Sequence, residues 1–135
     1  MKNHPPAIAD FLAQGSFAVV GASIDRAKYG NKVLRCYQQH DLPVVGVHPK
    51  LTEVEGTKVY PSLRQVPASV RAASVVAPPA AAMQIVEDAA AQGIRHLWFQ
   101  PGAEDAQASA AARAKGIAVI DNGACLLVAL GFRDS

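Results

Sequence analysis

The stretch FAVVGAS, residues 17–23, decides the fold of this chain. Four apolar residues lead into Gly21, and a polar segment then separates this stretch from an amphipathic run that begins near Gly30. Such a pattern is typical of a buried strand, a tight turn and a helix in an open α/β sheet. Gly21 can adopt the backbone angles of a sharp turn. The helix start beyond it offers unpaired N–H groups, which suit a phosphate.

The same alternation of apolar runs and helical patterns continues along the chain and predicts a five-stranded parallel sheet. The expected strands are residues 17–20, 43–47, 72–77, 95–99 and 117–120, with helices over 7–14, 29–40, 79–92 and 103–115 and a candidate last helix within the apolar tail 124–132. The segment 51–67 is expected to be a polar crossover in which Val59 and Tyr60 are a candidate short strand. Parallel strands need crossover connections, usually right-handed ones. The expected fold class is therefore α/β, an open sheet with helices on both faces.

Size and composition favour one compact domain, residues 1–135, over the other classes of protein. Half of the residues are hydrophobic, and the formal net charge is only +2 with the basic residues scattered. A nucleic-acid surface normally needs a basic stripe, and a membrane span needs about 20 apolar residues in a row, so we expect neither partner. The N-terminal stretch lacks a signal-peptide core, and two cysteines in different segments do not indicate a disulfide framework. We expect a soluble cytoplasmic protein.

Unusual residues collect where the expected strands end. In open α/β sheets, ligands bind beyond the carboxyl ends of the strands, where the strand order reverses. The segments at these ends carry glycine, proline or polar residues, namely Gly21–Ser23, His48–Lys50, Ala77–Pro78, Gln100–Gly102 and Asp121–Gly123. We therefore expect a ligand site along this edge, with Gly21, Ala22 and Ser23 at a diphosphate.

The charges near this edge indicate which nucleotide the site prefers. A site for NAD has an acidic residue after the second strand, but this chain has Lys50 there and no carboxylate before Glu53. A cation suits a ribose that carries an extra phosphate, as in NADP or coenzyme A. Arg26 and Lys32 are further candidate cations in the loop and the first turn of the following helix.

The sequence offers little that would support catalysis. His48 and His96 have no carboxylate placed to orient them, and no spacing of residues indicates a metal site. Cys36 is expected to lie in the core, where a free cysteine behaves as a small hydrophobe. Cys125 follows Asn122–Ala124 at the ligand edge, so a thiol-redox role there stays open. We expect no catalytic residues and no metal, although an enzyme is not excluded.

Five short motifs, in order along nearly the whole chain, resemble one known family. FAVVGAS, KYGNKV (28–33), VVGVHPK (44–50), VYPSL (59–63) and WFQPGAE (98–104) are similar to the small stand-alone CoA-binding proteins. These in turn resemble the CoA-binding domain of the succinyl-CoA synthetase alpha subunit and of ADP-forming acyl-CoA synthetases. The synthetases carry their phosphohistidine and ATP-grasp modules on other domains, so the resemblance implies a Rossmann-like domain that binds CoA or an acyl-CoA without ligating it.

The resemblance also implies which residues contact the cofactor. It places Gly21, Ala22, Ser23 and Arg26 at the diphosphate, and Lys50 matches the lysine that the family usually has after Asn-Pro. The full set of expected cofactor residues is Gly21, Ala22, Ser23, Arg26, Lys32, His48, Pro49 and Lys50 at the phosphates and ribose, Val76, Ala77 and Pro78 on the adenine side, and Gln100, Pro101 and Gly102 in the pocket wall. His48 replaces a more usual asparagine, and Ala77–Pro79 replaces a more usual Phe-Arg-type sequence.

Three alternatives stay open at this point. The chain is also compatible with an NADP-binding domain of an oxidoreductase, or with a redox protein in which Cys125 meets the thiol of CoA. A protein partner or a homo-oligomer is open as well, since the apolar tail from Leu126 to Phe132 suits an interface.

Overall fold

The computed structural model describes residues 3–134. In chain order the elements are α1 (Pro6–Leu12), β1 (Phe17–Val20), α2 (Tyr29–Gln39), β2 (Val44–Val47), β3 (Glu53–Val54), β4 (Thr57–Tyr60), the 3₁₀ turn η1 (Leu63–Gln65), β5 (Ala72–Val75), the 3₁₀ turn η2 (Pro79–Ala81), α3 (Ala82–Gln92), β6 (His96–Phe99), α4 (Ala106–Ala114), β7 (Ala118–Ile120) and α5 (Leu126–Leu130). Every expected strand and helix forms, β1 with the expected bounds and the others with shifted ends. α4 begins at Ala106 rather than at residue 103, because the Asp105 side chain caps it by accepting the N–H of Ala108 at 2.9 Å.

The sheet has seven strands, in the order β3-β4-β2-β1-β5-β6-β7. The expected count of five was wrong, because the segment expected to be a polar crossover forms the hairpin β3–β4. The candidate short strand at Val59 and Tyr60 is part of β4. This hairpin turns at Glu55 and Gly56, which both have positive φ, and it buries one apolar side chain from each strand, Val54 and Val59. Two buried apolar side chains are too few to produce an alternating pattern of apolar and polar residues in the sequence. β4 pairs in parallel with β2, while β3 is antiparallel to β4.

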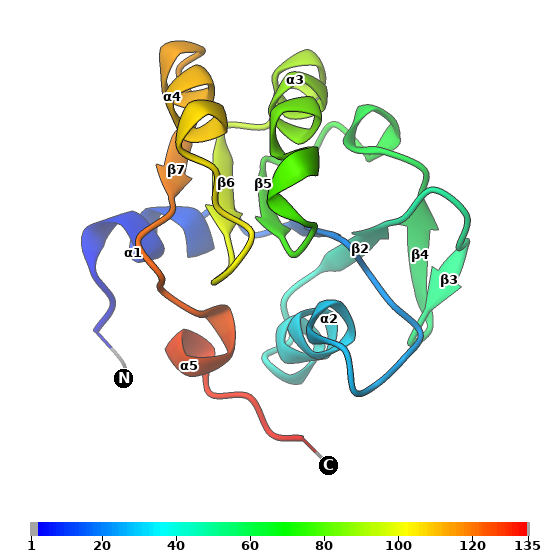
Figure 1. Cartoon of the computed structure of the whole chain (residues 1–135). Coiled ribbons are helices and arrows are strands. Elements are labelled where there is room, and N and C mark those ends of the chain that lie inside the picture. Colours follow the sequence, from blue (N-terminus) through cyan, green and yellow to red (C-terminus); the bar gives the residue numbers. More distant parts are fainter. Residues whose placement is uncertain (1–2, 135) are drawn as a thin grey trace.

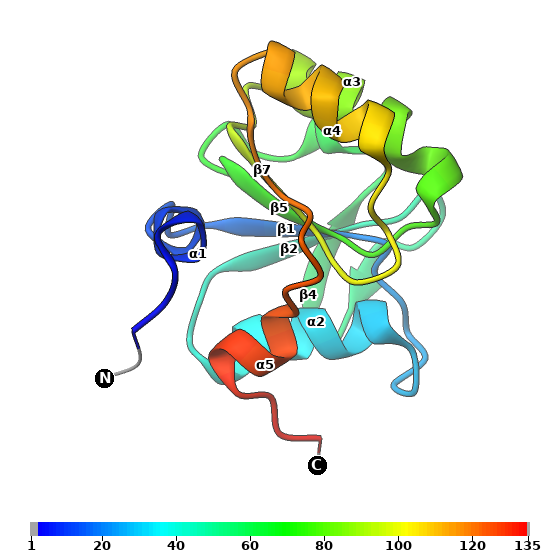
Figure 2. The ribbon, with the colours of Figure 1, turned by 60° about the vertical axis from the view of Figure 1, so that its left-hand side comes forward.

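Helices cover both faces of the sheet, as Figures 1 and 2 show. α3 and α4 lie on one face, and α1, α2 and α5 lie on the other. The strands are buried on both sides, which is why β1 and β5 are entirely apolar or small. Two separate cores result. One packs α3 and α4 on residues such as Val75 and Phe99, and the other packs α1, α2 and α5 around Phe17 and Trp98.

The strand order reverses between β1 and β5. β1 pairs in parallel with β2 on one side and with β5 on the other, and β5 continues in parallel to β6 and β7. The chain therefore runs from β1 outward to β4, crosses back to β5 and proceeds to the opposite edge. The carboxyl ends of all the parallel strands consequently meet at one edge of the sheet, with the reversal in the middle of it.

None of the helices within residues 3–134 combines the length and the apolar character needed to cross a bilayer. The same part of the chain holds no group of three or more His, Cys, Asp or Glu side chains arranged to hold a metal ion.

Candidate functional site

The turn after β1 is built on two glycines that let the backbone come close to its neighbours. Gly21 has φ of +97°, and a Cβ atom there would lie 3.2 Å from the carbonyl carbon of Val76 at the end of β5. A Cβ atom at Gly30 would lie only 1.9 Å from the carbonyl oxygen of Gly21. The first turn of α2 thus packs directly on the β1 turn, and only glycine fits at position 30.

Hydrogen bonds in this turn decide which donors can face an anion. The N–H groups of Gly21 and Ala22 both donate to the carbonyl of Val47, at 3.1 and 3.3 Å, so they hold β1 to β2. The Ser23 hydroxyl accepts the N–H of Asp25 at 3.1 Å, which leaves its own proton to donate. At the N-cap of α2, Lys28 makes no capping hydrogen bond with its side chain. The donors for an anion are therefore the first turn of α2 and the Ser23 hydroxyl.

Three neighbouring cavities follow the carboxyl edge of the sheet. The central cavity, of about 450 Å³, is lined by Gly21, Ala22, Ser23, Lys28, Tyr29, Gly30, His48, Val76, Ala77 and Pro78. The Leu63 cavity, of about 360 Å³, is lined by Val20, Gly21, Val47, His48, Pro49, Pro61, Ser62, Leu63, Ala77, Ala81, Gln84, Ile85 and Asp88. The Cys125 cavity, of about 530 Å³, is lined by Tyr29, Val76, Ala77, Pro78, Pro101, Gly102, Ala103 and Cys125. Because neighbouring cavities share lining residues, they form one groove across the strand reversal.

His48 stands where the central and Leu63 cavities meet. Its Nδ1 atom accepts the backbone N–H groups of Lys50 and Leu51, at 3.0 and 3.1 Å. An atom that accepts two N–H groups carries no proton, so the neutral ring has its proton on Nε2. His48 therefore shapes the turn after β2 and keeps one N–H to donate.

The groove brings together ten of the fourteen residues expected from the sequence. These are Gly21, Ala22, Ser23, His48, Pro49, Val76, Ala77, Pro78, Pro101 and Gly102. Arg26, Lys32, Lys50 and Gln100 do not line it. Lys50 is exposed on the turn that His48 holds, and directly follows Pro49, which lines the groove.

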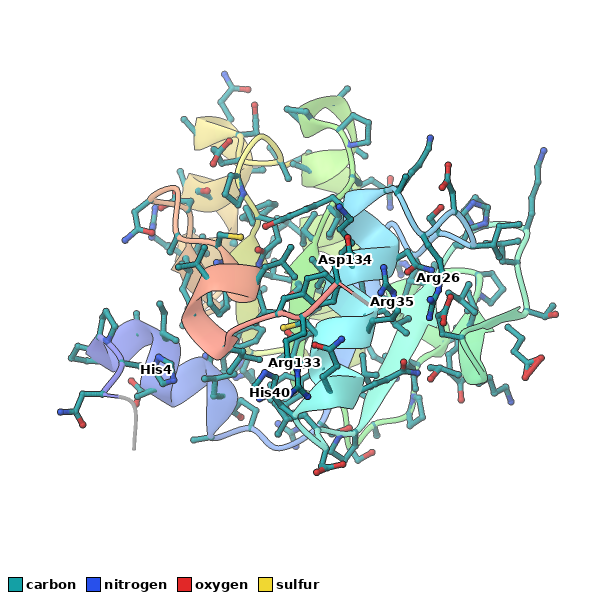
Figure 3. All side chains as sticks on the ribbon, turned by 90° about the horizontal axis from the view of Figure 1, so that it is seen from below. His4, Arg26, Arg35, His40, Arg133 and Asp134 are labelled. Atoms are coloured by element: carbon teal, nitrogen blue, oxygen red, sulfur yellow. The ribbon has the colours of Figure 1, made fainter. Side chains whose placement is uncertain are left out.

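Arg26 and Lys32 belong to a network on the outer side of α2, of which Figure 3 labels Arg26, Arg35 and Asp134. Arg26 forms a bidentate ion pair with Glu55, with N–O distances of 2.9 and 3.2 Å. The buried Arg35 donates to the carbonyl of Arg26 at 3.1 Å and to the carboxylate of Asp134 at 3.3 Å, and Lys32 pairs with Asp134 at 3.4 Å. The network ties the loop after β1 to the β3–β4 hairpin and to the C-terminal segment.

Glu55 is the acidic centre of this network. Hydrogen bonds from Arg26 and then from the Asn31 amide lower the pKa of Glu55 to about 2. The Asn31 amide also donates to the carbonyl of Ser23, at 2.8 Å. The β3–β4 hairpin, of which the sequence indicated only the candidate strand at Val59 and Tyr60, therefore supplies the carboxylate that occupies Arg26 and helps hold the end of the Gly21–Ser23 turn.

Gln100 lies beneath the groove rather than in its wall. Its side chain is fully buried, and Oε1 accepts the N–H of Leu126 at 2.9 Å and the hydroxyl of Tyr29 at 3.3 Å. The same hydroxyl contacts the sulfur of Cys125. Burial, and then the contact with Cys125, raise the pKa of Tyr29, so its phenol stays protonated.

Sequence reasoning missed several groove residues. Tyr29 is expected only as the first residue of a helix. The signal for its role is its position just before Gly30, which packs on the β1 turn. Lys28 is not among the expected cofactor residues, yet it lines the central cavity. Leu63 and Ile85 come from η1 and α3 on the other face of the sheet, and nothing in their local sequence separates them from ordinary core residues.

Comparisons with known proteins agree with this geometry. Residues 15–131 match the model of the CoA binding domain family. The chain is 34% identical over 71 residues, 53% of its length, to the ADP-forming acetate–CoA ligase I of Archaeoglobus fulgidus, of which it spans only 10%. A conserved hypothetical protein from Pyrococcus furiosus is 36% identical, with a TM-score of 0.79 over 84% of this chain and 97% of that one. A hypothetical protein from Pyrococcus horikoshii OT3 is 28% identical, with a TM-score of 0.84 over 95% of this chain and 94% of that one.

The family match spans β1 to the end of α5, and so includes the turn, the strand reversal and every strand that borders the groove. The chain therefore belongs to the CoA binding domain family.

Proposed function

We propose that this chain binds coenzyme A, free or acylated, along the groove and holds it without catalytic residues of its own. The observation that carries the proposal is the arrangement of the groove. A cavity with anion-binding donors lies in the middle, and a mainly apolar cavity lies on each side of it. Coenzyme A has the same order of parts, with a diphosphate between an adenosine and a pantetheine arm.

The diphosphate fits the central cavity. The first turn of α2 and the Ser23 hydroxyl supply donors, and Lys28 and the Nε2–H of His48 add a cation and a further donor. Helix N-termini favour anions both through their unpaired N–H groups and through the helix dipole. The two glycines keep side chains away from this position.

The adenosine end fits the Leu63 cavity. Pro49 and Ala77, both expected from the sequence, line it together with Leu63 and Ile85, which suit the faces of a base. In this placement the turn His48–Lys50 lies beside the ribose. The exposed Lys50 side chain then extends toward the 3′-phosphate, with which an ammonium makes a charge-assisted hydrogen bond.

The pantetheine arm then runs past Val76 and Pro78 into the Cys125 cavity, whose wall includes Pro101 and Gly102. An acyl group would lie at this end.

Calorimetric titration with CoA, 3′-dephospho-CoA and NADPH tests the proposal. We expect CoA to bind more tightly than either of the other two. The NADP alternative shares the diphosphate and the additional ribose phosphate but has no pantetheine for the Cys125 cavity. Binding of NADPH without binding of CoA would overturn the proposal in favour of the oxidoreductase alternative, and absence of binding by all three would overturn both.

A further inference from the structure

Cys125 lies at the opposite end of the groove from the Leu63 cavity. It directly precedes α5, is half-buried, and lines the Cys125 cavity together with Tyr29 and Pro101. It also borders a smaller outer cavity beside His4 and Ile8. Its thiol is therefore reachable from the groove, whereas the other cysteine, Cys36, is fully buried in the core under α2.

Two polar side chains from distant parts of the sequence meet behind this thiol. The Tyr29 hydroxyl contacts the sulfur of Cys125 and also lies 3.3 Å from Oε1 of Gln100. The N–H of Leu126, which can only donate, fixes the orientation of the Gln100 amide by bonding to the same Oε1. The amide nitrogen of Gln100 is left buried and without a hydrogen-bond partner among residues 3–134.

A buried donor without a partner is uncommon and requires an explanation. Here it lies next to a phenol that stays protonated, because burial raises the pKa of Tyr29. The hydroxyl of this phenol contacts the Cys125 sulfur. In thiol–disulfide exchange, the attacking form of a cysteine is its thiolate.

The connection between cavities brings the reactive end of the ligand to this thiol. The central and Cys125 cavities share Tyr29, Val76, Ala77 and Pro78. A CoA molecule whose diphosphate occupies the central cavity, as in the function proposed above, on which this step rests, extends its pantetheine arm toward Cys125. The arm ends in a thiol.

We propose that Cys125 is a site of covalent attachment of CoA by thiol–disulfide exchange with a CoA disulfide bound in the groove. The Cys125 thiolate attacks the CoA sulfur of the disulfide CoA–S–S–R, where R is the residue of a low-mass thiol or a second CoA. A Cys125–S–S–CoA bond forms, the original S–S bond breaks, and R leaves as a thiolate that takes up the proton given up by Cys125. The Cys125 sulfur is oxidised and the departing sulfur is reduced, so no further oxidant is needed.

The test uses the whole wild-type chain, reduced and then freed of reductant. Equal concentrations of CoA disulfide or of oxidised glutathione are added, and intact-mass and peptide-mapping spectrometry follow the adducts over time. We expect one CoA adduct on the Cys125 peptide that dithiothreitol removes, with the Cys36 peptide unmodified as an internal control. Binding raises the local concentration of the bound disulfide, so CoA disulfide should react roughly tenfold or more faster than oxidised glutathione.

Two further measurements separate a built site from an exposed thiol. Adenosine 3′,5′-bisphosphate, which occupies only the nucleotide part of the groove, should slow the reaction with CoA disulfide and leave that with oxidised glutathione unchanged. Tyr29→Phe, which removes the hydroxyl that contacts the sulfur, should slow both reactions. Equal rates for the two disulfides, a rate that the bisphosphate does not change, or an adduct on Cys36 instead would each overturn the proposal.

Calorimetry with reduced CoA in the presence of a phosphine reductant keeps this inference distinguishable from the proposed function. If reduced CoA binds but the Cys125 adduct does not form, only the covalent step is wrong. If reduced CoA does not bind, the proposed function itself fails.

Discussion

Gly30 and Gly21 are in such close contact that a Cβ atom at Gly30 would lie 1.9 Å from the carbonyl oxygen of Gly21. This contact seats the first turn of α2 on the turn after β1, and thereby positions the donors of the central cavity. The partner in the contact is backbone, which cannot swing aside as a flexible side chain can. A side chain at position 30 would therefore force the backbone of this turn or of α2 to move.

We expect Gly30→Ala to weaken both stability and CoA binding. Forcing one extra methyl group into a packed position costs about 1–3 kcal/mol of unfolding free energy, and the shifted helix start would misplace the phosphate donors. Denaturant unfolding and calorimetry measure the two effects. Gly93→Ala is the control, because Gly93 ends α3 with φ of +84° and a Cβ atom there has no neighbour within 4 Å. It should lower stability and leave CoA affinity unchanged. Unchanged CoA affinity in Gly30→Ala would contradict the role of the contact.

Lys50→Ala tests the contact proposed for the 3′-phosphate. Losing one charge-assisted hydrogen bond should cost about 1.5–3 kcal/mol of binding free energy, or roughly ten- to a hundredfold in affinity. The loss should be seen with CoA and be absent with 3′-dephospho-CoA, as calorimetry would show. Lys115→Ala removes the same charge from an exposed position at the end of α4 and should leave both affinities unchanged. Equal affinities of the wild-type chain for the two ligands would exclude the contact.

The turn after β2 depends on the acceptor that His48 provides. His48→Ala removes the partner of the N–H groups of Lys50 and Leu51, and should lower the free energy of unfolding by about 1 kcal/mol. An asparagine oxygen can accept N–H groups from the residues that follow it, so His48→Asn should retain most of that stability. Thermal or denaturant unfolding compares the three chains. If His48→Ala and His48→Asn lower the free energy of unfolding equally, the ring nitrogen does not hold the turn.

The pair formed by Tyr37 and Ser74 should show strong coupling. Their hydroxyl groups are 2.6 Å apart, and both residues are fully buried between α2 and β5. Tyr37→Phe leaves the Ser74 hydroxyl unsatisfied, which costs about 1–3 kcal/mol. The double variant Tyr37→Phe/Ser74→Ala removes both groups and should be less destabilised than the sum of the two single variants. Simple additivity in a double-mutant cycle of unfolding free energies would argue against the bond.

Glu55 should make stability depend on pH in the acidic range. The folded pKa of Glu55, about 2, lies below its ordinary value of 4.5 because Arg26 and Asn31 bond to its carboxylate. Its contribution is therefore fully present above about pH 4.5 and is lost as the pH falls toward 2. The Arg26 side chain is 58% exposed, so the contribution should be only about 0.2–1 kcal/mol.

Unfolding of the wild-type chain and of Glu55→Gln over this pH range checks the prediction. The difference in unfolding free energy between the two chains should be constant near neutral pH and shrink toward pH 2. A difference that does not change with pH would show that the carboxylate has no preferred partner in the folded state.

The sequence by itself determined the parallel strands from β1 outward, the turn at Gly21 and the edge on which the groove lies. These features follow from local patterns, because an apolar run that stops at glycine or proline specifies a buried strand and its end whatever the rest of the chain does. The expected strands beginning at Phe17 and Ala72, and the helix ending before Gly93, formed for this reason. The same patterns, together with the quoted motifs, were enough to indicate the family.

Only the tertiary structure decided which side chains meet. It paired Arg26 with Glu55 on a hairpin too short to leave a periodic pattern, and thereby directed Arg26 away from the groove. It also joined Tyr29 to Gln100, 71 residues further along the chain, and to Cys125, 96 residues further along. Contacts over such separations depend on strand order and on how each helix is seated on the sheet, and no local run of sequence encodes either.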